Sequence, residues 1–218
     1  MAHSFSIAAG AVPTFVRDRP LTRAALSFAS QAHGDDRRDA DGALFILHPL
    51  EVASLLTACG CRDEVTAAAI LHDTLEDTSA TDEQIRMRFG SAVAQLVCCL
   101  TEDDRIDDSH DRKSALRRQV ADCDREAAMV YAADKLSKVR ELRIRLHAEP
   151  AFTTTTEGRG KLDHYWRSLT MLEGRLRSHP LVGQLRFELE AIRDLPPHTT
   201  APTADRHDAR PPTPAHGA

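Results

Sequence analysis

The chain has 218 residues, of which 42% are hydrophobic and 28% charged, and its formal net charge is −5. This composition is typical of a soluble protein with one well-formed core. The acidic balance argues against a general nucleic-acid or membrane-surface binder, because such proteins need basic side chains to neutralise phosphates.

Two features favour a cytoplasmic protein. No apolar run approaches the roughly 18 residues that span a bilayer, and the N-terminal stretch MAHSFSIAAGAVPTFV lacks the basic leader of a signal peptide. The five cysteines form neither a CxxC zinc pair nor an even disulfide framework. We therefore expect small, buried or half-buried thiols.

The sequence predicts an all-α protein. Alternating β-branched runs are absent, aromatic residues make up only 5% of the chain, and good helix formers dominate. Gly34 should stop the first helix, Pro49 should begin the second, and Thr81 with Gln84 fits a capping box on the fourth. In chain order we expect helices over residues 20–33, 49–59, 63–77, 81–89, 91–101, 110–121, 124–147, 158–178 and 180–194.

The chain is expected to form a single domain over residues 19–194. Residues 35–47 should be a loop between the first two helices. We expect residues 1–18 to be a flexible N-terminal segment. Residues 195–218 are rich in proline, threonine and alanine, with few large apolar groups, and should form a disordered tail.

An acidic segment lies inside an apolar one. The sequence AAILHDTLED carries a histidine and three carboxylates, and no lysine or arginine occurs between Arg62 and Arg86. On one helix, these groups would share a broad face: His72, Asp73, Glu76 and Asp77. An unpaired buried carboxylate costs several kcal/mol or more, so a basic side chain from elsewhere or a metal ion should lie opposite. Glu76 and Asp77, near the helix end, could also simply face water.

Two further polar residues lie in apolar surroundings. His48 precedes a proline in FILHPLEV, and Asp134 lies in AAMVYAADKLSKV. Considered alone, a histidine such as His48 is more often a core or capping residue, and an acid such as Asp134 is more often a salt-bridge partner or a capped acid. With His72 and Asp73 they form two imidazoles and two carboxylates, a set that suits a first-row divalent ion with open positions for water.

The order His48, His72-Asp73, Asp134 resembles the H…HD…D signature of the HD superfamily of metal-dependent phosphohydrolases. From about Leu21 to Leu142 the chain also resembles the hydrolase domain of RelA/SpoT-type enzymes, and in particular the single-domain alarmone hydrolases. The segments that carry this resemblance are AHGDDRR, HPLEVASLL, AAILHDTLEDT, FGSAVAQLVCCLT and AADKLSKVREL. The resemblance implies an HD-domain helical bundle without a synthetase domain.

The resemblance implies that the chain hydrolyses the 3′-diphosphate of ppGpp and pppGpp, giving GDP or GTP and pyrophosphate, with a bound Mn²⁺ ion. By position, the metal ligands would be His48, His72, Asp73 and Asp134. Glu76 and Asp77 match the family's ED motif, which would position or deprotonate the attacking water and manage protons at the leaving group. The ligand set alone would also admit iron, magnesium, cobalt or zinc.

The resemblance also implies substrate contacts, although each of these side chains has an ordinary role at a surface or in a core. They are Arg37, Arg38, Lys138, Lys161 and Tyr165. The chain departs from the family at Asp39, where a basic residue is usual, at Leu44-Phe45 in place of Pro-Tyr, and at Lys138. It reads DKLSK where the family reads DRLHN or DKLYN.

These departures leave two alternatives beside the alarmone hydrolase. The first is an HD phosphohydrolase for another nucleotide, such as NADPH or a nucleoside phosphate. The second is a non-catalytic module that binds alarmones. In each case the expected partner is a small-molecule nucleotide, and neither nucleic acid nor a membrane is expected to bind.

Overall fold

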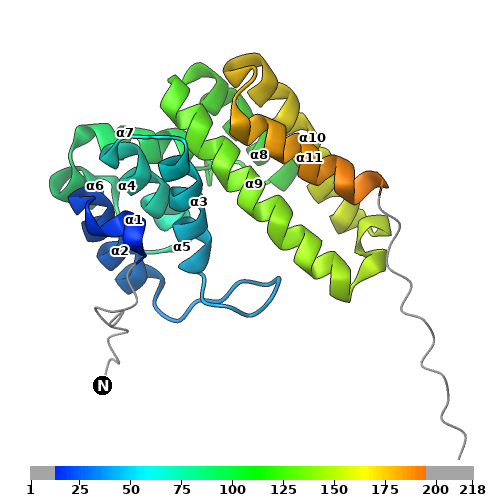
Figure 1. Cartoon of the computed structure of the whole chain (residues 1–218), viewed down its shortest axis with the longest axis horizontal. Coiled ribbons are helices and arrows are strands. Elements are labelled where there is room, and N and C mark those ends of the chain that lie inside the picture. Colours follow the sequence, from blue (N-terminus) through cyan, green and yellow to red (C-terminus); the bar gives the residue numbers. More distant parts are fainter. Residues whose placement is uncertain (1–12, 195–218) are drawn as a thin grey trace, which may run out of the picture.

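A computed structural model describes residues 13–194, and within them the chain is helical, which confirms the all-α prediction (Figure 1). The elements are α1 (Thr14–Arg17), α2 (Pro20–His33), α3 (Leu47–Ala58), α4 (Asp63–Leu71), α5 (Thr74–Asp77), α6 (Asp82–Phe89), α7 (Ser91–Leu100), α8 (Ser109–Asp122), α9 (Arg125–Ala148), the 3-10 helix η1 (Pro150–Thr154), α10 (Thr156–Leu176) and α11 (Pro180–Asp194). In this range, β-structure is limited to one isolated bridge between Arg37 and Leu44, inside the predicted loop.

Most predicted helices match the observed ones to within two residues. The capping box of α6 is present, with both the Thr81 and the Gln84 side-chain bonds. Gly34 ends α2 with a φ of 56°, a value that glycine adopts without strain. The prediction of one continuous helix over 63–77 is wrong, because the chain breaks between α4 and α5.

The ends of the chain were predicted to be flexible or disordered. Residues 1–12 and 195–218 lie outside the described residues, so those predictions stay predictions. The described part of the N-terminal segment contains α1, whose Val16 is fully buried. Within residues 13–194, no helix combines the length and the apolar character needed to cross a bilayer.

The core is built around α4. Every residue from Val65 to Leu71 is buried, because this stretch is apolar apart from Thr66 and packs against α2, α3 and α7. The α4 residue Asp63 also accepts hydrogen bonds from the backbone amides of Leu21 and Thr22, at 2.9 and 3.0 Å. It thereby provides hydrogen-bond acceptors for free backbone amides in the first turn of α2, a helix whose N-cap residue makes no side-chain capping bond.

The long helix α9 joins two groups of helices. It packs against α3, α4 and α7 on one side and against α10 and α11 on the other, as Figure 1 shows. Alanines at positions 127, 128, 132 and 133 are fully buried and allow this close approach. As a result, α3, α4 and α9 meet at the middle of the molecule.

The cysteines differ from expectation. Cys99 and Cys123 form a disulfide that joins the end of α7 to the end of α8, while Cys59, Cys61 and Cys98 are free. The two bonded cysteines are 24 positions apart, and only the packing of α7 on α8 brings them together. Their spacing in the sequence therefore gave no signal of a bond.

Candidate metal centre and substrate cavity

The break between α4 and α5 falls at His72 and Asp73, and side chains cause it. The Nδ1 atom of His72 lies 2.7 Å from the carbonyl oxygen of Ala69, and the Thr74 hydroxyl donates to the carbonyl of Leu71 at 2.6 Å. In a continuous helix these carbonyls would accept from backbone amides one turn later. The side-chain bonds replace that pattern and turn His72 and Asp73 toward the interior.

Four predicted metal ligands come together there from three parts of the chain. His48 lies at the start of α3, His72 and Asp73 at the break, and Asp134 on α9. One ligand atom from each of His48, His72 and Asp134 lies within 4.8 Å of the others. Asp73 adds its carboxylate, 3.1 Å from His72 Nε2 and 3.6 Å from His48 Nε2.

The donor atoms fit a divalent metal ion. Among the described residues, the buried atoms His48 Nε2, His72 Nε2 and Asp134 Oδ1 have no hydrogen-bond partner. A carbonyl can only accept a hydrogen bond, so the bond from His72 Nδ1 to Ala69 leaves the Nε2 lone pair free when the ring is neutral. Buried polar atoms are seldom left unsatisfied, and two imidazole nitrogens beside a carboxylate oxygen are typical ligands of a first-row metal.

Electrostatic interactions within the cluster also favour a bound cation. Burial disfavours the charged forms, but Asp73 and Asp134 outweigh it and raise the pKa of His72 to about 9. Burial also opposes ionisation of Asp134, yet Lys135 and the two histidines hold the pKa of Asp134 well below its ordinary value. The carboxylates that attract a proton to His72 would equally attract a metal cation.

Glu76 and Asp77 lie on α5, directly after the break. The Glu76 carboxylate accepts a hydrogen bond from the backbone amide of Glu102 at 2.5 Å. Glu76 is exposed as a residue, but the protein around its carboxylate, together with the charge of Asp73, raises the pKa of Glu76 to about 7. Burial and Asp73 also raise the pKa of Asp77. Both carboxyl groups therefore hold a proton more readily than usual, and Glu76 does so near neutral pH.

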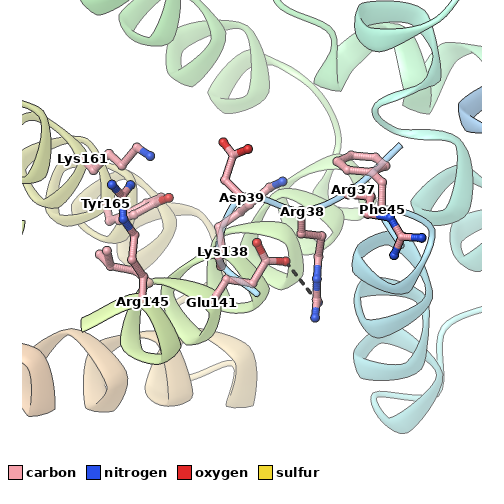
Figure 2. A pocket seen from close by; sticks show the side chains of 11 residues that line it. Arg37, Arg38, Asp39, Phe45, Lys138, Glu141, Arg145, Lys161 and Tyr165 are labelled. Atoms are coloured by element: carbon pink, nitrogen blue, oxygen red, sulfur yellow. Dashed lines mark ion pairs between the residues drawn. The ribbon is translucent and has the colours of Figure 1, made fainter. Parts of the chain in front are cut away.

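A cavity of about 200 Å³ lies between the loop that precedes α3 and helices α9 and α10. All five predicted substrate contacts line it, and Figure 2 shows the loop residues at one end and the α10 residues at the other. The labelled side chains are Arg37, Arg38, Asp39, Phe45, Lys138, Glu141, Arg145, Lys161 and Tyr165. The cavity is next to the metal ligands, because Glu141 lies 3.3 Å from His48 Nδ1 and 3.5 Å from Arg38.

The cavity is rich in positive charge. Arg38 pairs with Asp41 and Glu141, and Lys161 pairs with the exposed Glu157 at 3.0 Å. Lys138 points over the ring of Phe45, with its Nζ 5.3 Å from the ring centroid. Arginine and lysine together on one concave surface are suited to phosphate groups, which they bind through charge-assisted hydrogen bonds.

Comparison with known proteins identifies the family to which this chain belongs. The HD domain family model matches residues 25–157, which is more than half of the chain. The chain belongs to the HD-domain family. A solved structure of a metazoan orthologue of SpoT, described as hydrolysing ppGpp, superposes with a TM-score of 0.66 at 25% identity, over 80% of this chain and 96% of that one.

Several curated relatives carry the name of one hydrolase, and others are named GTP pyrophosphokinase rsh. The Xenopus tropicalis guanosine-3′,5′-bis(diphosphate) 3′-pyrophosphohydrolase MESH1 is 37% identical over 129 residues, which are 58% of this HD-domain chain and 72% of the relative. The human MESH1 is 39% identical over 121 residues, which are 54% and 67% of the two chains. The Aquifex aeolicus protein of the same enzyme name is 37% identical over 120 residues, but this chain spans only 17% of its length.

Three residues in contact with the proposed metal ligands of this HD domain were not predicted. The Lys135 side chain, which is 12% exposed, lies 2.7 Å from Asp134 Oδ2, while Oδ1 is directed at the histidines. Ser137 and Glu141 both contact His48 Nδ1. Ser137 and Glu141 follow Asp134 by three and seven positions, so the three side chains share one face of α9. This spacing was the signal in the sequence that could have indicated their place near the metal ligands.

A buried histidine behind the cavity makes folding sensitive to pH. Arg117 donates to His164 Nδ1 at 2.7 Å, and burial with the charges of Lys135 and Arg117 lowers the pKa of His164 from 6.5 to about 2. Below pH 6.5 the unfolded chain therefore binds a proton that the folded chain does not. The free energy of unfolding should fall by about 1.4 kcal/mol per pH unit as pH drops below that value.

Urea unfolding of the wild type and of His164→Gln at pH 7 and pH 5 measures this contribution. The wild type should lose about 2 kcal/mol more than the variant over this range. Equal losses in the two proteins would contradict the assignment of a neutral buried His164.

Proposed function

We propose that this chain is a metal-dependent (p)ppGpp 3′-pyrophosphohydrolase, which converts ppGpp to GDP, and pppGpp to GTP, with release of pyrophosphate. The observation that carries the proposal is the set of unpartnered donor atoms on His48, His72 and Asp134, next to a cavity rich in arginine and lysine. The Xenopus tropicalis and human relatives bear this enzyme name. Because the substrate is an intracellular nucleotide, we also propose a cytoplasmic location.

The metal proposed is Mn²⁺, held by His48, His72, Asp73 and Asp134. When bound, such an ion lowers the pKa of water toward neutrality and polarises phosphoryl oxygens. Lys135 supports this role, because it holds one oxygen of Asp134 and directs the other at the histidines.

The remaining roles belong to the chain's own side chains. Glu76 would take a proton from the attacking water, with its carboxylate oriented by the Glu102 amide, and Asp77 would manage the proton of the leaving oxygen. The proposed phosphate contacts are Arg37, Arg38, Lys138 and Lys161, and Tyr165 would offer an aromatic face for the base. The position of these groups beside the residues that would hold the metal supports attack of water on the phosphorus bonded to the ribose 3′ oxygen, which then leaves and takes up a proton.

Product analysis tests this function. Purified protein with Mn²⁺ and ppGpp should yield GDP and pyrophosphate in equal amounts by anion-exchange chromatography. Release of orthophosphate in place of pyrophosphate would contradict the proposal.

The second candidate is an HD phosphohydrolase acting on another phosphorylated nucleotide. Asp39 and Lys138, which depart from the family pattern, both line the cavity, and this favours it. The same assay with NADPH and with nucleoside mono- and diphosphates separates the two candidates, because only the first requires a 3′-diphosphate.

Lys138 should contribute to substrate affinity. Lys138→Asn removes a cation from the cavity and is expected to raise KM for ppGpp about tenfold, the scale of one charge-assisted hydrogen bond. The change in kcat should be small, because Lys138 is not among the proposed metal ligands or proton carriers. Steady-state kinetics measure both constants, and Arg86→Gln, an exposed charge change on α6 outside the cavity, serves as the control. A KM equal to that of the wild type would contradict a phosphate contact.

A further inference from the structure

The second ring nitrogen of His48 is at the end of a hydrogen-bonded chain. His48 and Ser137 are both fully buried, and His48 Nδ1 lies 3.0 Å from the Ser137 hydroxyl. Ser137 donates to Glu51 Oε2 at 2.9 Å, and Arg140 donates to Glu51 Oε1 at 3.2 Å. The chain crosses between α3, which carries His48 and Glu51, and α9, which carries Ser137 and Arg140.

The direction of these bonds follows from the chemistry of the groups. A serine hydroxyl has one hydrogen, which Ser137 donates to Glu51 Oε2, while Arg140 donates to the other oxygen of this carboxyl group. The Ser137 oxygen therefore accepts from His48, which means that Nδ1 carries the proton. Glu141 Oε1 lies 3.3 Å from the same nitrogen, and its negative charge also favours a proton on Nδ1. In a neutral ring this arrangement leaves the lone pair on Nε2, the atom that faces Asp134 at 3.3 Å.

We propose that Ser137 and Glu51 are positioning residues that hold His48 in the tautomer and ring orientation needed to bind the metal. Partners of a ligating histidine commonly act in this way, and their loss weakens metal binding. The inference rests on the metal site of the proposed function.

Binding of Mn²⁺ alone, measured by isothermal titration calorimetry without nucleotide, tests the proposal. Ser137→Ala should raise the Kd for Mn²⁺ by about 10- to 100-fold. Ser137→Thr keeps the hydroxyl and should bind within a few-fold of the wild type. Glu51→Ala should also weaken binding, because the Ser137 hydroxyl is then free to rotate and donate to His48.

Ser168→Ala is the matched control. Ser168 is also fully buried and bonded, to the Tyr131 hydroxyl and to the carbonyl of His164, but it does not contact a proposed ligand. It should bind Mn²⁺ as the wild type does, whatever its effect on the melting temperature. Loss of affinity in Ser137→Ala but not in Ser168→Ala therefore separates positioning of His48 from a general loss of packing.

The outcomes also separate this inference from the function on which it rests. If the wild type binds Mn²⁺ and Ser137→Ala binds it equally well, the positioning role is overturned and the metal site stands. If the wild type itself binds no Mn²⁺, both are overturned.

Discussion

Asp134→Asn is expected to abolish Mn²⁺ binding at working concentrations and to lower turnover by at least about 10²- to 10³-fold, the scale for loss of one preorganised electrostatic group. It is also expected to lower the free energy of unfolding by roughly 3 to 5 kcal/mol. The second effect arises because the Lys135 side chain, only 12% exposed, lies 2.7 Å from Asp134 and would be left with an uncompensated charge. Calorimetry with Mn²⁺ and urea unfolding measure the two effects.

A double variant separates the two roles of Asp134. Asp134→Asn with Lys135→Met removes the unpaired charge and should restore much of the lost stability, since an ion pair can be replaced by an apolar group of similar size. Metal binding should remain lost. Recovery of both stability and Mn²⁺ affinity in the double variant would show that Asp134 acts only as the partner of Lys135.

Glu76→Gln is expected to lower kcat by about 10²- to 10⁴-fold while Mn²⁺ affinity stays close to that of the wild type. Glutamine has nearly the same shape and can still accept the bond from the Glu102 amide, but it cannot take a proton. Steady-state kinetics and Mn²⁺ titration of the same preparation measure the two quantities. The expected loss therefore isolates the proton-transfer role.

Glu83→Gln, an exposed change of the same kind in the first turn of α6, is the control and should leave kcat unaltered. A Glu76→Gln protein with wild-type kcat would assign the proton transfer to another group, and Asp77→Asn would then be the variant to compare.

Much of the fold followed from local patterns. Apolar periodicity, the Thr81 capping box, the stop at Gly34 and the start near Pro49 placed most helices, because each is set by residues close in sequence. The break at His72 and Asp73 did not follow, because helix propensity does not register bonds from the His72 and Thr74 side chains to carbonyls of the preceding turn. The Cys99–Cys123 bond depends on the packing of two helices and has no local signal.

The candidate site was predictable residue by residue but not as a network. His48, His72, Asp73 and Asp134 were each notable as polar groups in apolar surroundings, and the structure brings them together. The roles of Lys135, Ser137 and Glu141 depend on distances between α3 and α9. Those distances come from tertiary packing, so no single segment could reveal them.

Release of pyrophosphate from ppGpp by the purified protein tests the central claim most directly. It should be measured with added Mn²⁺, with EDTA, and with Asp73→Asn as the control for contaminating activity. The account predicts turnover with Mn²⁺ that is lost in EDTA and in the variant. Failure of the Mn²⁺-bound wild type to turn over ppGpp, or release that persists in EDTA, would contradict it.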